Sequence, residues 1–413
     1  MNSKKMFLIN SLTFFFQIFN RLVPKNENQI LFESKPDFAD NANAMFHYLN
    51  ENAEIRDKYS FVWMVNDKKM IKSLEKKGIK ACNKFCLKGI IYLIRSKYLF
   101  VTHNENGSLK SNNQILINLW HGMPLKSMGF FKESENNSYL KFIKNSFGNN
   151  DFLIATSIIM KSAFASSFRI NPRKVHITGQ PRNDKLFCNT RSNISTLLNI
   201  DLSKYDKIIL FCPTFRPSKS RTKSSGLVKK SNIFDFEDYD ENHFHDFLRV
   251  NNILLLLTFH PFDEKYYLSE FRGNFNKDNI ILITKKMLKR SFFDLYDILG
   301  EIEILITDYS SVYFDFLLLD KPIIFTPTDF QQYSEERGFL FEPYEFWTPG
   351  PKVQNYKTFI KELKQSIEDP EYYKNERKIV NDIVNRYQDD KSCKRVYDLV
   401  FKDNEKFKRD DKN

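Results

Sequence analysis

The chain is a basic, aromatic-rich protein of 413 residues, long enough for about two or three domains. Hydrophobic residues make up 42% and charged residues 28%, which excludes a disordered chain, a collagen-like repeat and a small disulfide-stapled domain. The formal net charge of +12 favours a polyanionic partner: a nucleic acid, an anionic membrane or a phosphate-rich substrate. With 41 Phe and only 12 Gly, we expect much of the core to be aromatic.

The first apolar segment, residues 6–23, resembles a signal peptide or a membrane span. No small-residue cleavage site follows it, and polar residues interrupt it at positions 10, 13, 17 and 20, which recur at helical spacing. One polar stripe on an otherwise apolar helix, with basic residues at both ends, is typical of a helix in a membrane interface. A helix docked on the protein's own core is the alternative. We expect this helix within residues 1–25.

Short apolar runs alternate with helix-period segments from residue 26 onward, which predicts parallel sheets with crossover helices. Helices are expected at 42–52, 68–77 and 87–96. The expected strands are Gln29–Glu33, Phe61–Val65, Tyr98–Thr102, Gln114–Leu119, Phe152–Ala155, Val175–Thr178, Lys207–Phe211, Ile253–Phe259, Ile280–Ile283, Ile304–Thr307 and Pro322–Phe325.

The polar stretch 189–204 divides these strands into two series. The sequence therefore predicts an α/β protein of two doubly wound, Rossmann-type domains, 26–190 and 200–355, that face one another across a cleft. C-terminal helices and a charged tail are expected at 356–413. The stretch 216–230, rich in Ser, Lys and Arg, is expected to form a basic loop.

The five cysteines are too few and too scattered for a disulfide framework, so we expect reduced thiols. Cys82 and Cys86 have no second Cys/His pair at zinc-ligand spacing. His243 and His245 lie two residues apart on an expected helix and would not face the same way. We therefore expect no metal site.

Polar clusters directly follow four of the expected strands. In open parallel sheets ligands bind at the carboxyl ends of the strands, so this edge is the expected active site. The clusters are Trp120–Lys126, Pro213–Arg216, His260–Pro261 and Asp308–Ser311.

The last cluster is suited to a phosphate. Ser310 or Ser311 can cap the helix expected at 312–319, whose first backbone N–H groups have no partners within the helix. Simple capping would explain one serine. With Arg216 and His260 on neighbouring strands, the pattern favours a phosphate or pyrophosphate at the helix N-terminus.

Two histidines are placed for chemistry. Gly122 and Pro124 fix a turn beside His121 that would hold its imidazole outward, and Pro261 restricts the backbone of His260. The remaining histidines lack this context. They are His47, His103, His176, His243 and His245.

The motifs form an ordered set: WHGMPLK (120–126), GQPRND (179–184), PTFRP (213–217), FHP (259–261), ITDYSSVYFDF (306–316), KPIIF (321–325) and YSEERG (333–338). Together with ILFES (30–34) and DNANAMFHYL (40–49), they resemble the CDP-glycerol glycerophosphotransferase family, whose members build teichoic acids and related glycerol-phosphate capsule polymers in bacteria. The resemblance covers residues 28–350. It implies a GT-B-like arrangement of the two domains and a peripheral enzyme on the cytoplasmic face of the cell membrane, without a cofactor or a nucleic-acid partner.

The resemblance also implies the reaction. Glycerol phosphate passes from CDP-glycerol to a hydroxyl of a membrane-held acceptor, lipid-linked or polymeric, and CMP leaves. The family's roles map onto His121 as the base and onto His260, Arg216, Ser310 and Ser311 as the pyrophosphate clamp. The other residues implied in substrate binding are Gly122, Lys126, Thr214, Asp308, which would orient its loop, and Asp315, which would hold a donor hydroxyl.

The sequence departs from the family pattern in two places, and it leaves several functions possible. Met123 stands where the family often has Thr, which can alter the contacts to the acceptor. No large extra N-terminal domain of the kind that some polymerising members carry is expected. The sequence therefore leaves three roles open: priming a polymer chain, extending it, or decorating a capsule. The alternatives are a CDP-ribitol donor, a GT-B sugar-nucleotide glycosyltransferase, and a basic non-catalytic protein that binds nucleic acid or anionic lipid. Four clusters on one sheet edge argue against the last.

Overall fold

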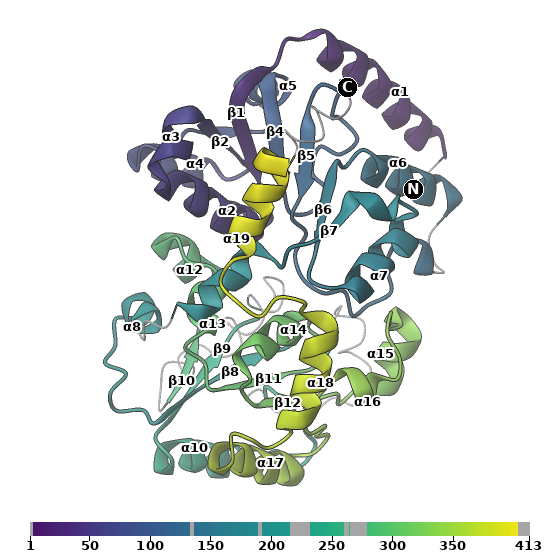
Figure 1. Cartoon of the computed structure of the whole chain (residues 1–413). Helices are drawn as coiled ribbons and strands as arrows, with labels where there is room; N and C mark the ends of the chain where they lie inside the picture. The colour runs from purple at the N-terminus through teal and green to yellow at the C-terminus, as the bar shows by residue number, and fades with distance from the viewer. Residues whose placement is uncertain are drawn as a thin grey trace. The chain divides into compact units, whose positions relative to one another are not determined.

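In a computed structural model the chain divides into two compact units, 1–187 with 383–413, and 188–382. The structure describes residues 3–132, 136–188, 192–214, 232–259, 264 and 279–403. The helices expected after residue 356 are shared between the units. Helix α17 (Tyr356–Glu368) belongs to the second unit, whereas α19 (Ser392–Tyr397) belongs to the first (Figure 1).

The N-terminal unit is built on a seven-stranded parallel sheet in the order β3-β2-β1-β4-β5-β6-β7. Its strands are nearly continuous apolar runs, as expected for strands that are covered on both faces. They are β1 (Asn26–Glu33), β2 (Ser60–Val65), β3 (Ala81–Asn83), β4 (Ser96–Val101), β5 (Ile115–Asn118), β6 (Phe152–Ala155) and β7 (Val175–Ile177).

Helices cover both faces of this sheet. On one face Phe32 of β1 stacks on Trp63 and Phe100, and Phe46 of helix α2 packs edge-on against Phe32, which confirms the expected aromatic core. On the other face Leu31, Leu99 and their neighbours form an apolar cluster under helix α5. The helices of this unit are α2 (Asp40–Glu51), α3 (Ala53–Lys58), α4 (Lys68–Lys76), α5 (Leu87–Arg95), α6 (Asn137–Gly148), α7 (Ile158–Phe168), α19 and the last turn η5 (Asp398–Asp403).

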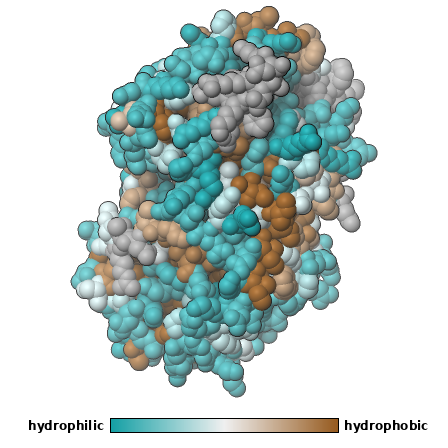
Figure 2. Space-filling view, in the orientation of Figure 1, coloured by the Kyte–Doolittle hydropathy of each residue, from teal (hydrophilic) through white to brown (hydrophobic). Residues whose placement is uncertain are grey.

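The N-terminal helix α1 (Ser3–Leu22) docks on this unit through its polar stripe. Gln17 donates to the carbonyl of Ser108 at 2.9 Å, and the buried Asn20 donates to Gln114 at 2.8 Å and to the Leu109 carbonyl. Phe16 packs against the cluster under α5. The apolar side points outward: Leu12, Phe14, Phe15, Ile18, Phe19 and Leu22 are exposed, and Figure 2 shows apolar side chains at the top of the molecule where Figure 1 draws the end of α1.

The C-terminal unit contains a five-stranded parallel sheet in the order β10-β9-β8-β11-β12. Its core includes Phe211, Phe234, Phe244 and Phe359, which again makes aromatic packing central. The strands are β8 (Lys207–Cys212), β9 (Ile253–Leu257), β10 (Ile280–Leu282), β11 (Ile304–Thr307) and β12 (Ile323–Phe325). The helices are α8 (Asn193–Leu198), α10 (Glu241–Val250), α12 (Lys285–Ser291), α13 (Tyr296–Leu299), α14 (Val312–Phe316) with η4 (Leu317–Leu319), α15 (Phe330–Arg337), α16 (Tyr344–Trp347), α17 and most of α18 (Lys374–Val384).

Two parallel, doubly wound sheets confirm the predicted α/β class. All eleven expected strands are present within about three residues of their predicted bounds, the usual uncertainty of element ends. The three-residue strand β3 was not predicted, because Ala-Cys-Asn contains none of the β-branched or aromatic residues that mark the equally short β7, β10 and β12. None of the helices in the described ranges has both the length and the hydropathy that a membrane span needs.

Candidate active site

The carboxyl end of β5 places His121 between two aromatic rings. Its imidazole lies 4.3 Å from the Trp120 ring and 3.9 Å from the His103 imidazole, centroid to centroid, and the two imidazoles are parallel to within 3°. Trp120 has a positive φ of 60°, which a bulky residue adopts only where its surroundings hold it. Asn118 accepts a hydrogen bond from the Trp120 amide, and the indole packs on Phe164. The ring of His121 is therefore fixed.

The backbone sets the tautomer of His121. Its Nδ1 lies 3.0 Å from the carbonyl oxygen of Thr102, and a carbonyl oxygen can only accept. Nδ1 therefore carries the proton, and Nε2 presents a lone pair. Burial lowers the pKa of His121, so that the neutral form predominates at pH 7. A fixed neutral imidazole with a bare Nε2 can act as a general base.

A buried ion pair lies behind the loop that carries His121. Arg182 Nη1 donates to Asp40 Oδ1 at 2.8 Å, and both residues are buried. Asn41, next to Asp40, donates to the carbonyl oxygens of Leu119 and Trp120 and accepts from the Arg182 amide. The DNANAMFHYL and GQPRND motifs thus hold the WHG loop in place.

The His103 side of the stack holds a second titratable group. His103 Nδ1 lies 2.9 Å from the Thr102 hydroxyl, and burial with the neighbouring His121 lowers the pKa of His103 to about 3. The carboxylate of Glu105 accepts from the His103 amide at 2.6 Å. Burial, with nearby Glu33, raises the pKa of Glu105 to about 7.

Two other predicted residues belong to the same loop. Gly122 is buried and has a φ of 127°, a conformation that a side chain would strain. Lys126 is half-buried at the end of the motif. Both stay predictions as substrate-binding residues.

The expectation that the polar clusters share one sheet edge is wrong: the His121 cluster follows β5 of the N-terminal sheet, whereas β8, β9 and β11 belong to the C-terminal sheet. At the edge of the C-terminal sheet, Asp308 joins two loops. Its Oδ1 accepts from the Thr214 amide at 2.7 Å, after β8, and from the Tyr309 amide, after β11. Asp308 is 3% exposed, and its own carbonyl oxygen accepts from the Tyr344 hydroxyl. The neighbouring side chain of Tyr309 stacks on Tyr333 at 3.9 Å. Thr214 and Asp308 are therefore brought together, and the loops that follow β8 and β11 start from one anchored point.

Ser310 and Ser311 lie half-buried beside this point. Ser311 occupies the N-cap position of α14, but its side chain makes no capping hydrogen bond. Ser310 faces Cys212, whose thiol pKa is raised to about 12 by burial and by Asp308. The serine expected to cap the helix by its side chain is thus not Ser311.

Asp315 is enclosed rather than open to a ligand. It is 1% exposed and accepts from the Tyr296 hydroxyl at 2.6 Å. This contact anchors α14 against α13, and a role in holding the donor stays a prediction. Arg216, His260 and the basic loop 216–230 lie outside the described residues.

The sequence reasoning missed the residues that support His121. His103, Asp40, Arg182 and Glu105 were not singled out, although His103 follows a predicted strand at the same sheet edge. Among the residues that the structure describes, no group of three or more Cys, His, Asp and Glu side chains is placed to hold a metal ion.

The sequence as a whole matches a known family model. The model, described as CDP-Glycerol:Poly(glycerophosphate) glycerophosphotransferase, spans residues 14–402. The chain belongs to this family. The resemblance drawn from the motifs is thereby confirmed, and the chain is a member of a family of transferases.

Curated relatives of this glycerophosphotransferase family member are named as teichoic acid enzymes. The teichoic acid glycerol-phosphate transferase of Staphylococcus aureus is 27% identical over 97% of this chain and 99% of its own length. The teichoic acid poly(glycerol phosphate) polymerase of Bacillus spizizenii is 30% identical over 87% of this chain and 88% of its own. A teichoic acid ribitol-phosphate primase of Bacillus spizizenii is 23% identical over 93% of this chain and 94% of its own length.

Solved structures show the same fold. The wall teichoic acid polymerase TagF superposes with a TM-score of 0.76 at 20% identity, over 95% of this chain and 93% of that chain. A putative UDP-N-acetylglucosamine 2-epimerase from Listeria monocytogenes gives a TM-score of 0.55 at 13% identity, over 92% and 98%. These likenesses confirm the predicted GT-B-like fold class.

Proposed function

We propose that the chain transfers glycerol phosphate from CDP-glycerol to a hydroxyl of a membrane-held acceptor and releases CMP. The observation that carries the proposal is the fixed imidazole of His121, with Nδ1 bound to the Thr102 carbonyl and Nε2 left as an acceptor. Family membership supports the reaction class, and the two glycerol-phosphate relatives support the donor. A TagF variant has also been solved after soaking with CDPG.

In the proposed mechanism, an acceptor hydroxyl attacks the β-phosphorus of CDP-glycerol. As the new O–P bond forms, the hydroxyl proton passes to Nε2 of His121, and the bond from the β-phosphorus to the bridging oxygen breaks. CMP leaves with that bond's electron pair. Because the Nδ1 proton is bound to the Thr102 carbonyl, the positive charge that develops on the imidazole is stabilised from behind.

The pyrophosphate is assigned to the edge of the C-terminal sheet. Thr214, Ser310 and Ser311 provide hydroxyls beside the anchor at Asp308, and hydroxyls and main-chain N–H groups are common phosphate ligands. Arg216 and His260, which the family motifs place after β8 and β9, are proposed as the cations that neutralise the developing charge. Asp315 is proposed to act through the placement of α14.

Attachment to a membrane is proposed for the outer side of the N-terminal unit. The exposed apolar residues of α1 have counterparts at α5, where Phe85, Leu87 and Ile91 are exposed. Both helices pack on the same apolar cluster and so cover the same face of the sheet. An apolar surface flanked by basic residues suits the interface of an anionic bilayer. The cytoplasmic face is the side on which a nucleotide donor is available.

The second candidate donor is CDP-ribitol. Relatives named as ribitol-phosphate enzymes also match most of the chain, at 23% and 26% identity. At these identities the family does not choose between the polyols.

A donor screen tests the proposal. Purified protein is given CDP-glycerol, CDP-ribitol or a UDP-sugar with a lipid-linked acceptor, while nucleotide release and product mass are followed. We expect CMP and a product heavier by one glycerol phosphate, formed by the wild type and by His47→Ala, a control at an exposed histidine of α2. Ribitol phosphate in the product selects the second candidate, and UDP release contradicts both.

A further inference from the structure

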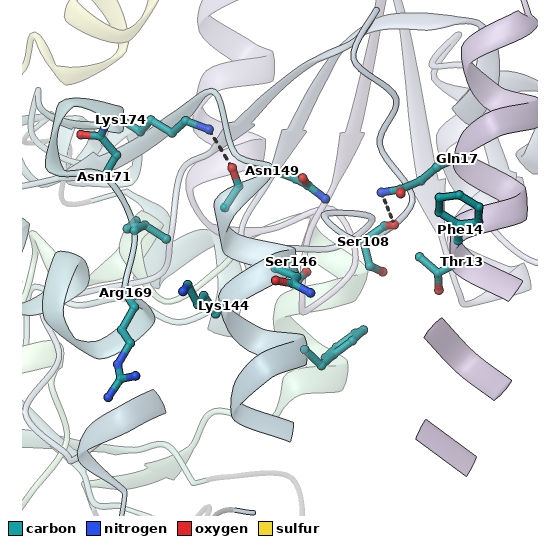
Figure 3. Close-up of a pocket in the computed structure, with 14 residues that line it drawn as sticks. Thr13, Phe14, Gln17, Ser108, Lys144, Ser146, Asn149, Arg169, Asn171 and Lys174 are labelled. Atoms are coloured by element: carbon teal, nitrogen blue, oxygen red, sulfur yellow. Dashed lines mark hydrogen bonds between the residues drawn. The ribbon is translucent and has the colours of Figure 1, made fainter. Parts of the chain in front are cut away.

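A pocket of about 640 Å³ lies in the N-terminal unit between α1, α6 and the end of α7. Thr13, Phe14 and Gln17 line it from α1, and basic side chains line it from the opposite side (Figure 3). The Gln17 hydrogen bond to Ser108 closes the α1 side of the pocket. The pocket is therefore formed by the way in which the N-terminal helix docks.

The described lining is cationic. It contains Lys144, Arg169 and Lys174, with several amides and hydroxyls and no acidic residue. Lys174 donates to the Gly148 carbonyl at 2.7 Å, which fixes its ammonium group at the rim. The guanidinium of Arg169 lies 3.9 Å from the Phe130 ring, which holds its plane. This chemistry suits a phosphate group with a polar substituent.

The pocket opens beside an apolar surface. Phe14 both lines the pocket and is exposed, and its neighbours Phe15 and Ile18 are exposed on the same helix. A soluble phosphate compound would leave this surface unused. A ligand with an anionic head and an apolar tail would use both.

We propose that this pocket binds the phosphate headgroup of an anionic membrane lipid, with the acyl chains against the exposed side of α1. This inference rests on the membrane attachment put forward above and adds to it a defined lipid site. The site would fix the depth and the rotation of the N-terminal unit at the bilayer, which an apolar face alone does not.

Vesicle co-sedimentation of the full chain tests the site. The vesicles are phosphatidylcholine alone or phosphatidylcholine mixed with phosphatidylglycerol. Lys144→Gln/Arg169→Gln is compared with Arg56→Gln/Lys58→Gln, which removes the same charge from exposed positions of α3, outside the pocket and outside the α1 and α5 surface. Each basic side chain near an anionic surface contributes about fivefold, so we expect the pocket variant to lose roughly 30-fold in binding to the mixed vesicles. The α3 variant should lose clearly less.

Two further variants separate this site from general attraction. Asn145→Trp fills the pocket from an exposed position of α6 without a change of charge, and it should also weaken binding to the mixed vesicles. Phe15→Asp/Phe19→Asp should abolish binding to both kinds of vesicle. Equal losses in the two charge variants, or wild-type binding by Asn145→Trp, would overturn the lipid site while attachment through α1 stands. A wild-type chain that binds neither vesicle overturns attachment itself, whereas transferase activity is measured separately with a soluble acceptor.

Discussion

At the carboxyl edge of the N-terminal sheet, ring packing and a buried ion pair fix His121, whereas at the same edge of the C-terminal sheet main-chain amides fix Asp308. The first arrangement holds one imidazole neutral and in one tautomer. In the second arrangement the Asp308 carboxylate already accepts two amide hydrogen bonds, and hydroxyl groups and loop backbone lie around it. The difference agrees with the proposal that one edge moves a proton and the other positions an anion.

Replacing His121 tests the first half of this comparison. We expect His121→Ala to lose on the order of 10²- to 10⁴-fold in turnover, because the proposed general base is removed. CDP-glycerol affinity, measured by calorimetry, should stay near the wild-type value. His260→Ala should lose donor affinity as well as rate. Retained turnover in His121→Ala, or the opposite pattern of affinities, would exchange the two roles.

Breaking the ion pair behind the loop should affect stability first. Arg182→Met removes the cation that is paired with the buried carboxylate of Asp40, which should cost about 3–5 kcal/mol in the free energy of unfolding. Urea unfolding followed by tryptophan fluorescence measures the loss. The double variant Arg182→Met/Asp40→Asn should recover part of it, because the uncompensated charge is gone. An Arg182→Met variant as stable as the wild type would show that the pair does not support the loop, and equal losses in the single and double variants would show that the charge of Asp40 is not the cause.

At the C-terminal edge, the accepting oxygen of Asp308 matters more than its charge. Both amide hydrogen bonds end on Oδ1. Asp308→Ala removes the acceptor of these two amide hydrogen bonds and should cost about 1–3 kcal/mol in stability, with weaker CDP-glycerol binding. Asp308→Asn keeps an oxygen at that position and should stay near wild type in both measurements. Equal defects in the two variants would assign the effect to the negative charge.

Much of this architecture could be predicted because apolar runs between helical segments specify parallel strands. The supporting contacts of His121 could not all be found this way. Asp40 and Arg182 are 142 residues apart, and nothing local relates them. His103 had a usable signal: strands β4 and β5 are consecutive and pair Val101 with Asn118, so the residues just beyond them must meet. His103 was not predicted as a site residue because it lies outside all of the sequence motifs.

The burial of the Asp315 carboxylate could not be predicted from the sequence either. Asp315 lies on a helix of five residues, too short for its hydrophobic pattern to tell a buried side from an exposed one. In the structure the Tyr296 hydroxyl donates a hydrogen bond to the buried Asp315 carboxylate. Residues 215–231 and 260–263, which include Arg216 and His260, lie outside the described part of the chain, so their roles stay predictions.

The smallest expected effect is a change in the pKa of His121 when His103 is replaced. The pKa of His121 is lowered chiefly by burial, with Asp40 opposing this shift and Arg182 adding to it. His103 covers one face of the ring and is itself neutral at pH 7, because its pKa is about 3. Opening that face to water should raise the pKa of His121 toward its ordinary value.

A base works only when it is deprotonated, so turnover rises with pH through the pKa of His121 and is complete above it. In His103→Asn this acidic limb should move to higher pH, by on the order of half a unit, with little change in turnover at pH 8. His103→Phe is the matched control: it keeps a flat ring over His121 and should leave the limb in place. Glu105, with a pKa raised to about 7, titrates nearby in both variants, so Glu105→Gln is combined with each to remove its contribution. A limb that moves equally in His103→Asn and His103→Phe would show that the Thr102 contact of His103, and not the stacked ring, controls the base.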